Sequence, residues 1–107
     1  MILKQYQIIQ VNLDPTQGSK IKKTRPCVIL SPDEMNNHLQ TIVVAPMTST
    51  LRNYPTRVEI RHGNKIGFLV LDQIRTVDRR RIIQQMGSLS LREIYKVKKT
   101  LRETFID

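Results

Sequence analysis

The residues of this chain that most often carry chemistry are two histidines, one cysteine and many cations. His38 and His62 lie far apart in the sequence, and Cys27 is the only thiol. This set does not supply the usual ligands of a zinc site, so we expect no metal and no cofactor. Cys27 cannot form an internal disulfide, and it belongs to the apolar run Cys27-Val28-Ile29-Leu30 with no histidine beside it. We therefore interpret Cys27 as a core residue rather than a nucleophile.

The charge of the chain narrows the choice of partner. Its 18 Lys and Arg residues stand against 9 Asp and Glu residues, which gives a formal net charge of +9 over 107 residues. Such an excess of cations favours a polyanionic partner. An acidic membrane surface is the alternative, but membrane-surface proteins typically show a basic amphipathic helix with exposed aromatic residues. Aromatic residues make up only 5% of this chain, so nucleic acid is favoured.

Cleavage of RNA by its own 2′-hydroxyl sets three chemical tasks. That hydroxyl must lose its proton, charge on the pentavalent phosphorus must be neutralised, and the departing 5′-oxygen must be protonated. Histidine pairs often perform such proton transfers, but here both histidines are interpreted as surface residues. Arg25 suits the second task, because its planar guanidinium binds two phosphate oxygens and stays charged. The alternative is that Arg25 pairs with a carboxylate at the end of a strand.

The elements that would position Arg25 are predicted from the first half of the chain. Residues 6–13 are rich in β-branched side chains and end at Asp14-Pro15, which predicts a strand and a turn. Residues 16–24 are polar and cationic, which is typical of a loop. Residues 26–30 form an apolar run that predicts a strand buried on both faces. Ser31-Pro32-Asp33-Glu34 places a capping side chain, a proline and two acids in order, and predicts a short helix to about Leu39.

The second half predicts more strands and one long helix. The segments 41–45, 57–60 and 67–71 read as strands, the last two joined as a hairpin through residues 62–65. Residues 74–77 and 84–87 are expected to form a last strand pair. Ser90-Leu91-Arg92-Glu93 is a capping box. The apolar residues that follow recur at helical spacing and predict one buried stripe: Leu91, Ile94, Val97, Leu101 and Phe105.

Five or six short strands around one core, with helices at the side and the end, predict an α+β fold with a small β-barrel. A chain of this length falls within the usual size of a single domain, and no linker or repeat interrupts it. We therefore expect one domain over residues 1–107. The amino terminus has no features of a secretion signal, and no run approaches the roughly 18 apolar residues of a membrane span, so a cytoplasmic location is expected.

Several short motifs, taken in order, resemble the MazF/PemK toxins. The match runs from about residue 6 to residue 104. It rests on these pieces: Asp14-Pro15-Thr16-Gln17-Gly18-Ser19, Thr24-Arg25-Pro26, Val28-Ile29-Leu30-Ser31-Pro32, Ala45-Pro46-Met47-Thr48-Ser49, Tyr54-Pro55-Thr56-Arg57-Val58-Glu59-Ile60 and Leu71-Asp72-Gln73-Ile74-Arg75-Thr76-Val77-Asp78.

The resemblance implies a fold and an activity. The fold is an SH3-like barrel of the CcdB/MazF/PemK type with a C-terminal helix, and the active unit is a homodimer that binds RNA across its interface. The activity is metal-independent cleavage of single-stranded RNA at a short sequence, which leaves a 2′,3′-cyclic phosphate and a 5′-hydroxyl. The family's catalytic residues fall on Arg25, which would stabilise the charge of the phosphorane, and on Thr48, which would position the phosphate.

A wider set of residues is expected to bind RNA: Ser19, Lys20, Lys22, Lys23, Asp72 and Gln73. Asp72 matches an acidic residue implicated as a base in some relatives, and the alternative is a structural hydrogen-bond acceptor. Lys20 replaces a glutamate that relatives commonly carry, so it either adds phosphate affinity or removes a group that orders Arg25. Tyr54 is either a platform for base stacking or a packing residue. The run Arg79-Arg80-Arg81 is either a solvated face or a further contact to RNA.

Two other functions remain open on the sequence. One is a CcdB-like toxin that poisons gyrase, but the ending Glu103-Thr104-Phe105-Ile106-Asp107 does not resemble the tryptophan-bearing tail of CcdB. The other is a basic RNA-binding module that does not cleave. The resemblance also implies an acidic, MazE-like antitoxin protein as a partner, which the charge of +9 makes physically reasonable.

Overall fold

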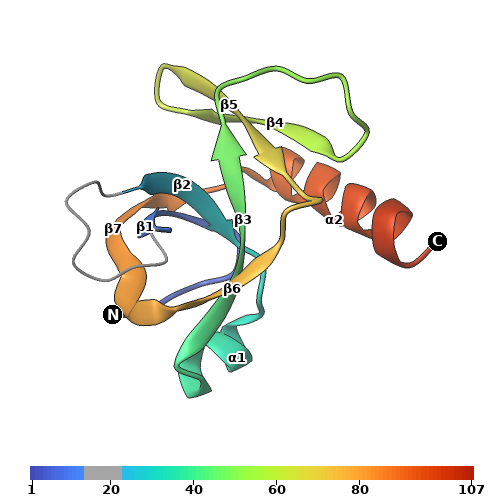
Figure 1. Ribbon diagram of the computed structural model, residues 1–107. Helices are drawn as coiled ribbons and strands as arrows, with labels where there is room; N and C mark the ends of the chain where they lie inside the picture. Colours follow the sequence, from blue (N-terminus) through green and yellow to red (C-terminus); the bar gives the residue numbers. More distant parts are fainter. Residues whose placement is uncertain (14–22) are drawn as a thin grey trace.

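A curled antiparallel sheet with a long C-terminal helix dominates the computed structural model, which describes residues 1–13 and 23–107 (Figure 1). The elements in chain order are β1 (Gln7–Asn12), β2 (Thr24–Ile29), α1 (Asp33–His38), β3 (Thr41–Thr48), β4 (Arg57–His62), β5 (Lys65–Val70), β6 (Arg75–Asp78), the 3₁₀ turn η1 (Arg79–Arg81), β7 (Ile82–Ser88) and α2 (Leu91–Phe105). The expected α+β fold is confirmed, with the sheet curled into a half-barrel.

Strand β3 connects the two parts of the sheet. The strand order is β4-β5-β3-β2-β1-β7, and β6 also pairs with β3. The first half of β3 lies against β6, whereas Met47 and Thr48 at its end lie against β5. On its other edge β3 pairs with β2, with Cys27 opposite Pro46. The end of β3 therefore lies where the β4-β5 hairpin, β2 and the rest of the sheet meet (Figure 1).

Both faces of the central strands are buried, as predicted for residues 26–30. Neighbouring residues on one strand belong to different apolar clusters, because successive side chains of a strand point to opposite faces. Val28 belongs to the cluster that includes Val97 of α2, whereas Cys27 belongs to the cluster of the barrel interior. The interpretation of Cys27 as a core residue is confirmed. Burial raises the pKa of its thiol to about 12.

The predicted last strand pair is wrong. Strand β6 pairs with β3, and β7 pairs with β1, so residues 74–77 and 84–87 do not form a hairpin. The 3₁₀ turn Arg79–Arg81 separates them, and its first backbone turn is closed by the carboxylate of Asp78, which accepts from the Arg80 N–H at 2.8 Å. This turn directs the two strands to different partners.

Helix α2 confirms the capping box and corrects the apolar stripe. The Ser90 hydroxyl accepts from Glu93 N–H, and the Glu93 carboxylate accepts from Ser90 N–H. Val97 is fully buried, but Leu91 is 87% exposed and Phe105 is 60% exposed. The first turn is held to β4, where the Glu93 carboxylate accepts from the Arg61 backbone N–H at 2.7 Å, and the C-terminal end projects beyond the sheet (Figure 1). Helical spacing predicted the face correctly but not how much of its length is covered.

The short helix α1 is confirmed, but its predicted cap is not. Pro32 occupies the N-cap position and makes no side-chain capping hydrogen bond. The Ser31 side chain is instead buried and bonded to Asn36 and to the backbone of β3. No helix among residues 1–13 and 23–107 is both long enough and apolar enough to cross a membrane.

Candidate functional site

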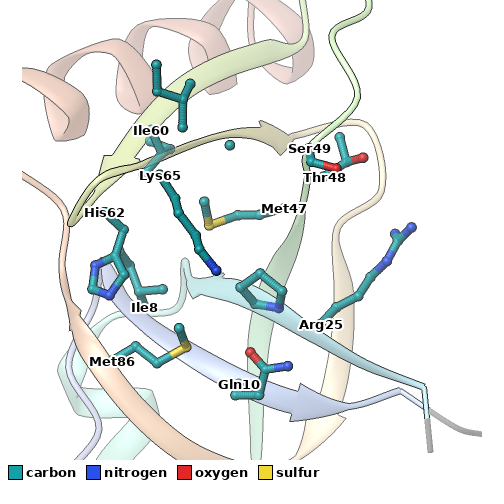
Figure 2. Close-up of a pocket in the computed structure, with 13 residues that line it drawn as sticks. Ile8, Gln10, Arg25, Met47, Thr48, Ser49, Ile60, His62, Lys65 and Met86 are labelled. Atoms are coloured by element: carbon teal, nitrogen blue, oxygen red, sulfur yellow. The ribbon is translucent and has the colours of Figure 1, made fainter.

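Arg25 and Thr48 come together from two adjacent strands. Arg25 is near the start of β2, and Thr48 is the last residue of β3. The antiparallel register that places Cys27 opposite Pro46 brings Arg25 level with Thr48 two residues further on. The two residues line the same two cavities, and Figure 2 shows both at one end of the larger one. The sequence-predicted catalytic pair is thus adjacent in space.

The two side chains differ in their freedom. The Arg25 side chain is exposed at the cavity mouth, where its guanidinium can reach a ligand. The hydroxyl oxygen of Thr48 accepts a hydrogen bond from the backbone N–H of Thr50 at 3.2 Å. This bond fixes the oxygen while leaving its proton available to donate. A guanidinium and a hydroxyl donor on one rim form a suitable site for a phosphate group.

The larger cavity has an apolar wall and a polar rim, and its volume is about 440 Å³. The residues that line it include the apolar Ile8, Met47 and Met86 and the polar Gln10 and Lys65, with His62 on the side away from Arg25 (Figure 2). A cavity of this kind can enclose a flat apolar group while polar groups contact its edge.

His62, which the sequence placed on the surface, lines this larger cavity. It ends β4 and lies opposite Lys65 across the two-residue turn that contains Gly63, with φ at +60°. Gly87 of β7 lies against the imidazole: a methyl group built there would approach the ring carbon Cε1 to 3.3 Å. The hairpin was predicted correctly, but the packing of its tip over β1 and β7 could not be read from the local pattern. The other histidine, His38, is exposed at the end of α1.

The smaller cavity is polar and strongly cationic. Its volume is about 220 Å³, and Gln73 lines it together with Thr50 and Val70. Three arginines also line it: Arg25, Arg52 and Arg57. No Asp or Glu is among the described residues that line it. Sequence reasoning had not singled out Arg52 or Arg57, although Arg57 belongs to one of the motifs that carried the resemblance.

The two other polar residues predicted after β5 have different positions. Gln73 lines the smaller cavity with Arg25 and Thr48. Asp72 lines neither cavity: its carboxylate accepts a hydrogen bond from the Thr56 hydroxyl at 2.9 Å. The geometry of Asp72 is that of a structural acceptor which ties the loop before β4 to the turn after β5.

The structure describes only part of the segment between β1 and β2, which the sequence predicts to be a cationic loop. Ser19, Lys20 and Lys22 lie outside the described residues. Lys23 is exposed directly before β2, and its carbonyl accepts from the Leu13 N–H at 2.8 Å. Lys23 is therefore two residues from Arg25, on the same approach to the site.

The run Arg79-Arg80-Arg81 is bonded to the protein itself. Arg79 donates to the Leu39 carbonyl at 3.1 Å, and Arg81 donates to the Asn12 carbonyl at 3.3 Å. Arg80 forms two side-chain hydrogen bonds with Asp78. These bonds hold the pKa of Asp78 well below its usual range and raise the pKa of Arg80. These three arginines line neither cavity.

Residues that usually bind metals do not cluster here. Within residues 1–13 and 23–107 there is no group of three or more His, Cys, Asp or Glu side chains placed to hold a metal ion. The functional groups that line the two cavities are guanidinium groups, hydroxyls, two amides, an imidazole and an ammonium group. Such a set can bind a chain of phosphates and stabilise developing negative charge.

Comparison with known proteins identifies the class to which this fold and site belong. Residues 4–105 match the family described as PemK-like, MazF-like toxin of type II toxin-antitoxin system. This chain belongs to that family, as the order of its sequence motifs predicted. Two curated relatives are named Endoribonuclease MazF. The one from Staphylococcus saprophyticus is 30% identical over 102 residues, covering 90% of this chain and 85% of the relative. The one from Staphylococcus epidermidis is 30% identical over 106 residues, covering 94% and 88%.

Solved structures support the fold. A MazE-MazF structure from Deinococcus radiodurans superposes with a TM-score of 0.82 at 24% identity, covering 96% of this chain and 95% of the other. An endoribonuclease in complex with its cognate antitoxin, from a mycobacterial species, superposes with a TM-score of 0.81 at 20% identity, covering 94% and 92%. At these identities the likeness concerns the fold alone.

Proposed function

We propose that this chain is the endoribonuclease toxin of a type II toxin-antitoxin system and that it cleaves single-stranded RNA, including mRNA, without a metal ion. The observation that carries the proposal is the convergence of Arg25 and Thr48, from adjacent strands, on a rim shared by two cavities. The family match supports the activity, because curated relatives at 30% identity are named endoribonucleases.

The reaction is an internal transfer at phosphorus. The 2′-oxygen of one nucleotide bonds to the adjacent phosphorus, and the bond from that phosphorus to the 5′-oxygen breaks. The products are a 2′,3′-cyclic phosphate and a 5′-hydroxyl, so the proton lost by one oxygen is balanced by the proton gained by the other. Arg25 stabilises the charge of the pentavalent phosphorane, and the Thr48 hydroxyl donates to a phosphate oxygen. Since neither residue is a strong base near neutral pH, rate arises mainly from positioning and electrostatics.

The remaining expectations complete the proposal. Ser19, Lys20, Lys22 and Lys23 bind RNA, and so does Gln73, which lines the smaller cavity with Arg25. Residues 1–107 act as one toxin domain, which works as a homodimer in the cytoplasm. An acidic, MazE-like antitoxin binds the cationic site and competes with RNA. The net charge of +9 supports a partner of this kind.

The test is cleavage of a long unstructured RNA by the purified chain in the presence of EDTA. We expect discrete cuts with cyclic-phosphate ends, and sequencing of the fragment ends would give the preferred motif. Arg25→Ala should lower the cleavage rate by about 100-fold to 1,000-fold, the usual effect of losing one group that stabilises transition-state charge. Arg61→Ala is the charge-matched control, because the Arg61 side chain is exposed on β4 and its Nε lies 3.7 Å from the Glu59 carboxylate.

Each other outcome points to a different function. A gel shift without cuts would indicate the RNA-binding module, and inhibition of gyrase without RNA cleavage would indicate the CcdB-like toxin. If Arg25→Ala and Arg61→Ala cleave equally well, the assignment of Arg25 is wrong.

A further inference from the structure

The smaller cavity contains more positive charge than the cleavage of one phosphate requires. Arg25, Arg52 and Arg57 surround about 220 Å³, and none of the described residues that line it is acidic. Like charges placed together repel one another unless an anion lies between them. The two hydroxyl residues that line it, Thr48 and Thr50, add further donors. The cavity is therefore built to hold an anion.

Arg57 gives this reading its sharpest support. It is half-buried at the start of β4, opposite Val70 of β5. Its side-chain Nε is fully buried, and no hydrogen-bond partner for it exists among the described residues. A buried donor without an acceptor is unfavourable, and such groups are rare in proteins unless a ligand or water satisfies them. A bound anion in the cavity that Arg57 lines would supply the missing acceptor once a small rotation of the side chain turns this buried Nε towards it.

Tyr54 holds Arg57 in place. The Arg57 guanidinium carbon lies 5.5 Å from the centre of the Tyr54 ring. The backbone N–H of Arg57 donates to the backbone carbonyl of Tyr54 at 3.1 Å. A cation above an aromatic face is attracted to it, which restricts the plane of the guanidinium. Since one face of the Tyr54 ring is already occupied by Arg57, this ring acts first as a support for the arginine.

Of the residues that the structure describes, the two cavities have Arg25 and Thr48 in common and no others. The larger cavity borders the closed end of the β4-β5 hairpin, at His62 and Lys65, whereas the smaller borders its open end, at Arg57. An RNA strand whose cleaved phosphate lies on Arg25 and Thr48 would therefore extend into both. One neighbouring group would meet an apolar wall, and the other would meet guanidinium groups.

We propose that Arg57, supported by Tyr54 and assisted by Arg52, binds the phosphodiester adjacent to the one that is cleaved. This inference rests on the proposed function and adds a second phosphate subsite to it. The site would make cleavage depend on a negative charge at one flanking position, in addition to the charge at the cut. Arg57 would thus determine how much RNA on that side of the cut the enzyme requires.

The first experiment neutralises one phosphate at a time. Oligoribonucleotides containing the cleaved motif would carry a single uncharged methylphosphonate at either phosphate flanking the cut. For the unmodified enzyme, one of these substitutions should lower kcat/KM by about 10-fold to 100-fold, as expected for loss of a charge-assisted contact. Arg57→Ala should lower kcat/KM on the fully charged RNA by a similar factor. In Arg57→Ala, the same methylphosphonate should lower kcat/KM little further, because the substitution and the methylphosphonate each remove the same contact.

The second experiment measures binding without cleavage. A 2′-deoxy nucleotide at the cut prevents the reaction, so the Kd of this RNA can be measured against salt concentration. Each phosphate contact to single-stranded RNA contributes about 0.7 to the slope of log Kd against log salt. Arg57→Ala should lower that slope by about 0.7, and Arg61→Ala, on the same strand but outside the cavity, should leave it unchanged. Arg57→Lys should keep the slope and recover only part of kcat/KM, because lysine lacks the planar fork.

Two results would overturn the second subsite. One is an equal methylphosphonate penalty in the unmodified enzyme and Arg57→Ala at both flanking positions. The other is a salt slope that Arg57→Ala does not change. Thermal melting of both Arg57 variants establishes whether they are folded. If Arg57→Ala is not folded, the test uses kcat/KM of Arg57→Lys, and a value equal to that of the unmodified enzyme would contradict the site. If the unmodified chain does not cleave RNA at all, the proposed function fails. If it cleaves RNA but the effects of the methylphosphonate and of Arg57→Ala are independent, only the second subsite fails.

Discussion

A pair of adjacent asparagines in α1 gives a matched test of how the fold is stabilised around β3. Asn36 is fully buried, and Asn37 is exposed beside it. The Asn36 side chain accepts from the Ser31 hydroxyl at 2.6 Å and donates to the Ser31 carbonyl at 3.0 Å. The Ser31 hydroxyl in turn accepts from the Val43 backbone N–H at 3.1 Å. Asn36 thus completes a buried network that ties α1 to the strand carrying Thr48.

The expected effect of Asn36→Ala follows from this network. The substitution removes two hydrogen bonds and leaves a buried hydroxyl donor and a buried carbonyl without their partner, each worth about 1–3 kcal/mol. Alanine regains roughly 0.5 kcal/mol in helix propensity. We therefore expect Asn36→Ala to lower the free energy of unfolding by about 1.5–5.5 kcal/mol, and to lower Tm by about 4 °C for each kcal/mol. Asn37→Ala should change the free energy of unfolding by less than about 0.5 kcal/mol.

Urea denaturation followed by circular dichroism measures both variants under the same conditions. Asn36 lines neither cavity, so the cleavage rate per folded molecule should stay within about twofold of the unmodified chain at a temperature well below Tm. If Asn36→Ala loses no more stability than Asn37→Ala, the buried network does not stabilise the fold. If it retains stability but loses cleavage, Asn36 acts on the site in a way that the structure does not explain.

Two further predictions concern the core. Because burial raises the pKa of the Cys27 thiol to about 12, iodoacetamide at pH 8 should label the unfolded chain but not the folded one. The unfolded thiol loses its proton from about pH 9, so this group's contribution to stability should fall as pH rises from about 9 towards 12. Urea denaturation at mildly and strongly alkaline pH checks this, and an identical pH dependence in Cys27→Ala would contradict it. In α2, Val97→Ala should lower the free energy of unfolding by about 2 kcal/mol, whereas Leu91→Ala should change it by less than about 0.5 kcal/mol. Equal losses in the two helix variants would mean that the helix does not pack as the exposures of Val97 and Leu91 indicate.

Local structure was largely determined by the sequence. The β4-β5 hairpin, the capping box at Ser90 and the strand around Cys27 were predicted correctly, because turn residues, capping side chains and apolar runs act on their own neighbours. The excess of cations indicated a polyanionic partner through charge alone. The order of short motifs indicated the family and directed attention to Arg25 and Thr48.

Long-range arrangement was decided only by the tertiary structure. A strand pattern shows which face is apolar but not which strand will pair with it, so the partners of β6 and β7 could not be predicted from their sequences. Helical spacing likewise predicted the inner face of α2 but not that Leu91 is exposed and that the C-terminal end extends past the sheet. The cationic cavity has the same origin. Arg25, Arg52, Arg57 and Gln73 come from separate segments, and the pairing of β2 with β3, β3 with β5 and β5 with β4 brings them together. A cavity is formed by packing between segments and not by any one of them.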